Sequence, residues 1–140
     1  MKESVQPYLM FGGRCQEALD FYKSALGAQV DFTMRYNEMP EPPPPGRIPV
    51  GWENKICHCS FRIGTSTLMA SDGCEANAKF EGFSLGLNAA DDAEAEKLFN
   101  ALSPGAKITM PLQKTFWTSK FGMLTDKFGI GWMVSVEHEH

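Results

Sequence analysis

The segment Cys57-His58-Cys59 places an imidazole between two thiols, side chains that serve in proton transfer, nucleophilic attack and metal binding. Neighbouring strand residues point to opposite faces, so a regular strand over 56–63 would keep His58 from sharing one ion with both cysteines. The apolar residues of this segment, expected to be buried, are Cys57, Cys59, Phe61 and Ile63, and the polar ones are His58, Ser60 and Arg62. If the polar face lines a ligand site, His58 is a candidate for proton transfer and Ser60 for ligand binding. A structural histidine of the sheet is the open alternative.

Other signs of chemistry are few. The four cysteines, which include Cys15 and Cys74, show no zinc-finger or Cys-x-x-Cys spacing, so we expect free thiols in a reducing compartment. The chain has no G-x-S-x-G motif and no P-loop. Asp126 is expected to serve a turn. His138 and His140 near the C-terminus could bind metal only adventitiously.

Composition indicates one folded domain, residues 1–140, because 43% of the residues are apolar and 21% are charged. The net charge of -4 disfavours nucleic acid and anionic membranes as partners. No apolar run approaches the roughly 20 residues that cross a bilayer, and the first residues show no basic region followed by a long apolar segment. We therefore expect a cytoplasmic protein without a membrane partner.

The chain reads as a doubled module, because the pattern that begins at Glu17-Ala18 recurs at Glu94-Ala95. Amphipathic spacing predicts helices over 15–26, stopped by Gly27, and over 93–102, capped by Asp91 or Asp92. The expected strands are 5–11, 29–36, 56–63 and 67–71, then 83–89, 106–110, 121–125 and 130–136. Each half is thus βαβββ, in modules of about 5–73 and 80–136. Between the second and third strands of the first module, the four prolines Pro42 to Pro45 predict a stiff excursion over the surface.

Several stretches carry a family resemblance: Pro7-Tyr8-Leu9, Glu17 to Tyr22, Leu68 to Asp72, and Phe116-Trp117 with Phe121 to Trp132. They resemble the vicinal oxygen chelate (glyoxalase/bleomycin resistance/dioxygenase) superfamily, in particular its PhnB-like or 3-demethylubiquinone methyltransferase-like branch. The resemblance implies an α+β fold in which two βαβββ modules form a cupped mixed sheet with helices on the convex side. It also implies a small-molecule ligand in the concave groove and a homodimer.

The resemblance implies that the metal ligands of metal-dependent relatives come from the first and fourth strands of each module. Those positions fall on Pro7 and Met69 in the first module and on Ser84 and Met133 in the second. Strand alternation also puts Ser84 on the face opposite Leu85 and Leu87. Proline, serine and thioethers suit divalent ions poorly, so we expect ligand-lining residues, no metal and no cofactor.

Aromatic and glycine residues complete the candidate set. Trp117 is either a pocket wall or a dimer contact, and both remain open, whereas Trp132 is expected in the core. Gly12-Gly13 is the sole candidate for the glycine-rich turn of a methyl-donor nucleotide site, and it lacks a further glycine. Methyl transfer is therefore disfavoured.

The sequence favours a metal-independent, small-molecule-binding protein of the glyoxalase-like superfamily. One alternative is a non-catalytic sequestering protein like the bleomycin-resistance members. Another is a metal-dependent isomerase, lyase or dioxygenase with unrecognised ligands. Whether a reaction is catalysed, and on which substrate, stays open at this point.

Overall fold

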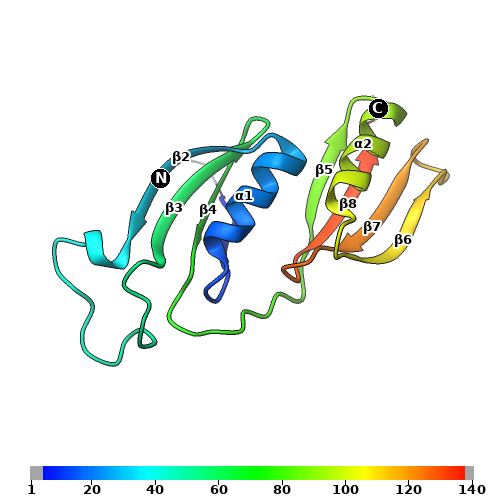
Figure 1. The fold of residues 1–140 in the computed structure, drawn as a ribbon. Coiled ribbons are helices and arrows are strands. Elements are labelled where there is room, and N and C mark those ends of the chain that lie inside the picture. Colours follow the sequence, from blue (N-terminus) through cyan, green and yellow to red (C-terminus); the bar gives the residue numbers. More distant parts are fainter. Residues whose placement is uncertain (1–4, 138–140) are drawn as a thin grey trace. The chain divides into compact units, whose positions relative to one another are not determined.

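The structure is a computed structural model that describes residues 5–137. The chain divides into two compact units, one up to Ala78 and one from Lys79 onward. Each unit contains one four-stranded sheet and one α-helix (Figure 1).

Both units have the same topology. The elements of the first are β1 (Tyr8–Met10), α1 (Cys15–Leu26), β2 (Gln29–Arg35), the 3-10 helix η1 (Tyr36–Glu38), β3 (Ile56–Ile63) and β4 (Ser66–Ser71). Those of the second are β5 (Leu85–Ala89), α2 (Asp92–Leu102), β6 (Lys107–Gln113), β7 (Phe121–Thr125) and β8 (Gly131–Val136). The strand orders are β1-β4-β3-β2 and β5-β8-β7-β6, each with one parallel pair, β1 with β4 and β5 with β8. The α+β class and the doubled βαβββ pattern are confirmed.

The two helices begin and end where local signals place them. Helix α1 has the predicted bounds, and Gly27 ends it with a φ of 67°, a left-handed conformation that glycine adopts at little cost. Helix α2 starts one residue earlier than predicted, at Asp92. The Asp91 side chain caps it by accepting a hydrogen bond of 2.8 Å from the Glu94 amide.

Each helix buries one stripe of side chains against its own sheet. In the first unit, Tyr22 of α1 stacks on Phe61 of β3 with ring centroids 6.5 Å apart. The Cys15 and Cys59 thiols also meet there, with their sulfur atoms 3.9 Å apart. In the second unit α2 buries Ala95, Phe99 and Leu102, and Trp132 is buried as predicted.

Strand β6 is longer than the sequence indicated. It continues past Met110 through Pro111 to Gln113. Proline has no amide hydrogen, so it cannot donate the hydrogen bond that a central strand requires at that position. The strand lies at the edge of its sheet, where one row of backbone groups needs no partner, and proline is tolerated there.

Two buried aspartates tie chain segments together. The Asp72 carboxylate, 1% exposed, accepts hydrogen bonds from the Cys15 amide at 2.8 Å and the Ile56 amide at 2.7 Å. It therefore joins the start of α1 to the start of β3. Asp126 accepts from the amides of Phe128 and Ile130, which confirms its predicted role in the turn.

The segment between η1 and β3 contains the predicted proline excursion, and Pro42 to Pro45 lie outside every helix and strand. Trp52 anchors this segment, because its ring is buried and packs at Gly13. Tyr36 provides a second anchor, since its hydroxyl donates to the Gly73 carbonyl, and burial raises its pKa to about 12.

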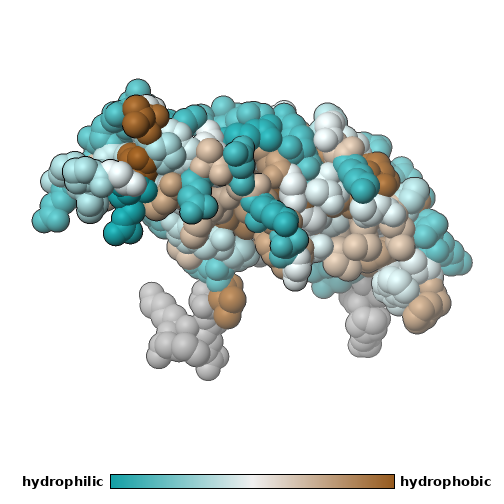
Figure 2. Space-filling view, turned by 90° about the horizontal axis from the view of Figure 1, so that it is seen from below, coloured by the Kyte–Doolittle hydropathy of each residue, from teal (hydrophilic) through white to brown (hydrophobic). Residues whose placement is uncertain are grey.

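The molecular surface is mixed in character. Figure 2 shows one face, on which hydrophobic residues are interspersed among hydrophilic ones. In the described part of the chain, no helix is both long and apolar enough to cross a membrane.

Candidate functional site

The first sheet has one face that α1 does not cover. Strand pairing aligns Tyr8 with Met69, Met69 with Ser60, and Ser60 with Phe32, so these side chains form one row across the four strands. Leu9, Cys59 and Ala70, which alternate with them, are buried toward α1. We call the exposed side the open face; its members are Tyr8, Met10, Phe32, Met34, His58, Ser60, Arg62 and Met69.

An irregularity in β3 decides how His58 is presented. Met34 pairs with His58 but the next residue, Arg35, pairs with Ile56, so Cys57 is the extra residue of a bulge. The condition of a regular strand over 56–63 is therefore not met at this position, and Cys57, like Ile63, is half-buried rather than part of the core. Cys59 is fully buried, as expected, and His58 lies on the opposite face from it.

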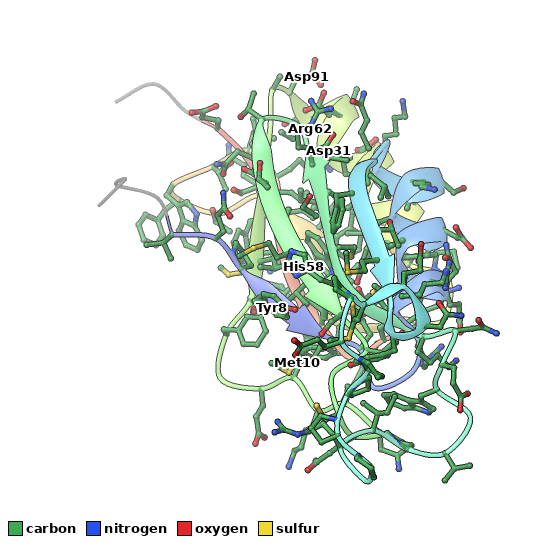
Figure 3. The ribbon with its side chains drawn as sticks, turned by 90° about the vertical axis from the view of Figure 1, so that its left-hand side faces the viewer. Tyr8, Met10, Asp31, His58, Arg62 and Asp91 are labelled. Carbon is green, nitrogen blue, oxygen red and sulfur yellow. The ribbon has the colours of Figure 1, made fainter. Side chains whose placement is uncertain are left out.

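His58 is half-buried between two aromatic rings of the open face. Its Nδ1 atom lies 3.3 Å from the hydroxyl oxygen of Tyr8, and the two ring centroids are 5.7 Å apart. The Phe32 ring lies 6.2 Å from the imidazole. Figure 3 shows Tyr8 and His58 close together, with Met10 nearby. Tyr8, Phe32 and Met10 remain 40%, 47% and 56% exposed, so their apolar surface is available to a ligand.

The charged groups of this face lie at one end of β3. The Arg62 guanidinium contacts the Asp31 carboxylate at 2.9 Å and donates to the Gln29 side chain at 2.8 Å. The hydrogen bond and the charge of Asp31 raise the pKa of Arg62. The charges of Arg62 and Asp31 therefore offset one another at this end of the open face.

The strand register corrects one inference about the repeat. The side chain opposite Met69 belongs to Tyr8, whereas Pro7 precedes β1 and contributes its carbonyl, which accepts a 2.9 Å hydrogen bond from the Met69 amide. In the second sheet the residue opposite Met133 is Gly86. Pro7 and Ser84 are therefore not equivalent positions of the repeat. The offset in residue number that relates the two helices differs from the offset that relates β1 to β5.

The second sheet also leaves one face without its helix. Met133 pairs with Gly86 on one side and with Met123 on the other. Ser84 lies beside Gly131 on the same face, opposite the Leu85 side as predicted. The structure thus groups the predicted residues by unit: His58, Ser60 and Met69 in the first, Ser84 and Met133 in the second.

Trp117 lies in the loop before β7. Its ring makes edge contacts with Phe116 at 4.8 Å and Phe121 at 5.3 Å, and it is 48% exposed while Phe116 is 97% exposed. Phe121 itself is buried and contacts the Trp117 ring. Both predicted roles of Trp117, pocket wall and dimer contact, remain open.

The donor atoms do not fit a hard divalent ion. Within residues 5–137 no group of three or more His, Cys, Asp or Glu side chains is arranged to hold a metal. The side chains near the superfamily's ligand positions are phenol, thioether and hydroxyl, of which thioethers suit only soft ions.

A methyl-donor nucleotide is not accommodated at the glycine turn either. A side-chain carbon at Gly12 would lie 2.5 Å from the Ala78 backbone nitrogen, and one at Gly13 would meet the Trp52 ring at 3.2 Å. The amide of Cys15 at the helix start is already taken by the Asp72 carboxylate. The turn is therefore packed closely against Ala78 and Trp52, and the amide at the helix start already has an acceptor.

Sequence reasoning missed two aromatic members of the open face, Tyr8 and Phe32. The signal for Tyr8 was its alternation with the apolar Leu9. Phe32 had no such signal, because a register shift between Val30 and Phe32 sets its direction.

Comparisons with known proteins cover almost the whole chain. The family model described as 3-demethylubiquinone-9 3-methyltransferase matches residues 3–135. Protein YjdN of Escherichia coli is 36% identical over 138 residues, 94% of each chain. The crystal structure of protein PA1353 from Pseudomonas aeruginosa is 41% identical with a TM-score of 0.82, covering 97% of this chain and 100% of that one. A putative 3-demethylubiquinone-9 3-methyltransferase, PhnB protein, from Bacillus cereus is 27% identical with a TM-score of 0.78, covering 96% and 100%.

Proposed function

The chain belongs to the 3-demethylubiquinone-9 3-methyltransferase family, the PhnB-like branch of the vicinal oxygen chelate superfamily, and we propose that it binds a small organic molecule on the open face of its first sheet. The observation that carries this proposal is the half-buried His58 between the exposed rings of Tyr8 and Phe32. The binding is metal-independent in this proposal, and the free thiols favour a cytoplasmic setting.

The open face has the composition of a ligand site. Aromatic and thioether side chains supply most of its contact surface, and a few polar groups can orient a ligand. Because Tyr8 and Phe32 are 40% and 47% exposed, burying the rest of either ring against a ligand contributes on the order of 1 kcal/mol. His58 and Ser60 are the polar groups that lie among the apolar ones.

Methyl transfer, the reaction in the family's description, is not part of this proposal. The glycine turn before α1 is packed against Ala78 and Trp52, as described above. No reaction step is assigned to His58 beyond binding and holding a hydrogen at a ring nitrogen.

Replacing Phe32 by alanine is expected to weaken the binding of a ligand found in a metabolite thermal-shift panel by about fivefold, because the ligand loses an aromatic contact. Isothermal titration calorimetry measures this effect. Phe83→Ala is the matched control, since Phe83 in the second unit is 46% exposed and Phe32 is 47% exposed. Equal weakening by both substitutions would place the ligand elsewhere.

Incubating the protein with the same ligand distinguishes binding alone from catalysis. If the protein consumes or converts it over hours, the site belongs to an enzyme. If the ligand is recovered unchanged, a sequestering role like that of the bleomycin-resistance members is favoured instead.

Metal independence predicts substoichiometric zinc, nickel, manganese and iron in the purified protein. The measurement is elemental analysis of a variant that lacks His138 and His140, which lie outside the described residues and could bind ions adventitiously. Adding these ions should not raise the unfolding temperature. A near-equimolar ion together with a stability gain would restore the metal-enzyme alternative.

Homodimerisation is a further part of the proposal, through the pair of exposed rings at Phe116 and Trp117. Light scattering is expected to give twice the 15.5 kDa chain mass. The double substitution Phe116→Ser with Trp117→Ser should shift the protein toward monomer, because it removes the apolar surface of the contact. Phe83→Ser should leave the mass unchanged. A monomeric parent protein at micromolar concentration would contradict this proposal.

A further inference from the structure

The contact between Tyr8 and His58 has a direction. A phenol carries one hydrogen that it can donate, and a neutral imidazole has one nitrogen that accepts and one that donates. An O–H···N bond from the Tyr8 hydroxyl to Nδ1 pairs the stronger donor, a phenol O–H, with the stronger acceptor, an unprotonated imidazole nitrogen. In that arrangement the ring hydrogen of neutral His58 resides on Nε2.

The Nε2 atom of His58 has no hydrogen-bond partner among residues 5–137, and the residue is half-buried. The Tyr8 hydroxyl is the one hydrogen-bond partner of the imidazole among residues 5–137. Arg62, two positions beyond Ser60 on the same face, is already held by Asp31 and Gln29. The Nε2–H donor thus belongs to an imidazole whose ring centroid lies 6.2 Å from that of Phe32.

We infer that Tyr8 is a positioning residue that holds His58 in its Nε2–H form, and that the open face takes a planar carbonyl compound whose oxygen accepts from this donor. The ligand class rests on the proposed function, whereas the role of Tyr8 does not. Phe32 packs on the planar part, and the thioether of Met69, in the row beside Tyr8, contributes soft contact surface.

The first experiment reads the ring hydrogen directly. The chain has three histidines, so a variant lacking His138 and His140 leaves His58 as the sole source of imidazole signals. Long-range proton–nitrogen correlation NMR at pH ~8.5, about two units above the ordinary histidine pKa, is expected to show a protonated Nε2 and an unprotonated Nδ1. In Tyr8→Phe the Nδ1 signal should move toward the averaged position of two exchanging forms. A protonated Nδ1, or spectra unchanged by Tyr8→Phe, would overturn the role of Tyr8.

The second experiment tests the ligand class with two probes of almost the same shape. Acetophenone carries a carbonyl oxygen, and α-methylstyrene has a methylene group in its place. Acetophenone is expected to bind about fivefold more tightly, the ratio that one net hydrogen bond provides. Chemical-shift titration of the His58 ring measures both affinities. The ratio should decrease in Tyr8→Phe, without reaching one, because Nε2 then carries the hydrogen only part of the time, and it should stay unchanged in Phe83→Leu.

The outcomes of the two experiments are separable. Equal binding of both probes with Nε2 protonated would refute the carbonyl class and leave the role of Tyr8 supported. Absence of binding by either probe at millimolar concentration would count against the ligand class and the proposed function together, while the NMR result would still decide the role of Tyr8.

Discussion

Asp72→Ala is expected to lower the free energy of unfolding by about 3 to 5 kcal/mol. The Asp72 carboxylate is buried and accepts hydrogen bonds from the amides of Cys15 and Ile56. A hydrogen bond to a charged group contributes about 1.5–3 kcal/mol, and alanine would leave both buried amides without that partner. Chemical denaturation measures the loss, and hydrogen exchange should show it at the start of α1 and of β3.

Asp91→Ala is the matched control that tests whether the effect of Asp72→Ala depends on burial of the carboxylate. Asp91 also accepts one amide hydrogen bond at a helix start, from Glu94, but it is exposed to water. Its replacement should cost about 1 kcal/mol, as for an ordinary helix cap. Similar losses for Asp72→Ala and Asp91→Ala would show that the buried carboxylate has no special role in joining α1 to β3.

Asp126→Ala is expected to destabilise the second unit by a comparable amount, about 3 to 5 kcal/mol. The Asp126 carboxylate, 4% exposed, accepts from the Phe128 amide at 2.9 Å, the Ile130 amide at 3.0 Å and the Trp132 indole nitrogen at 2.8 Å. The substitution therefore removes the acceptor of three buried donors. Hydrogen exchange should locate the lost protection in β7 and β8.

Trp132→Phe tests the hydrogen bond from the indole to Asp126 separately from the hydrogen bonds that Asp126 accepts within the turn. It removes one of the three hydrogen bonds and keeps an aromatic ring in the core, so its cost should be smaller than that of Asp126→Ala. If Trp132→Phe were the more destabilising change, packing of the indole rather than acceptance by Asp126 would hold this turn. Either variant can be followed by denaturation at constant protein concentration.

Local patterns were sufficient for most elements of the fold. Helix α1 has the predicted ends because an amphipathic stripe and Gly27 define it within a dozen residues. The repeat of Glu17-Ala18 at Glu94-Ala95 predicted two equal modules, and the identical strand orders confirm them. Strand β6 ran past its predicted end because an edge position removes the penalty on Pro111.

The candidate site was predicted less completely. His58, Ser60 and Met69 were singled out, and they do share one face of the first sheet. Tyr8 and Phe32 were missed. Tyr8 lies one residue from the predicted Pro7, and alternation moves a side chain to the other face with every one-residue step. Phe32 depends on an irregular pairing between β2 and β3.

By itself the sequence determined which segments are helices and strands and which side of each is apolar, because those properties follow from periodicity within one segment. Only the tertiary structure decided the register between strands, the bulge at Cys57 and the burial of Asp72, because each depends on backbone groups far away in the sequence. The pairing of Tyr8 with His58 is of the second kind. The two residues are 50 positions apart, and β4, which lies between their strands, brings them to one face.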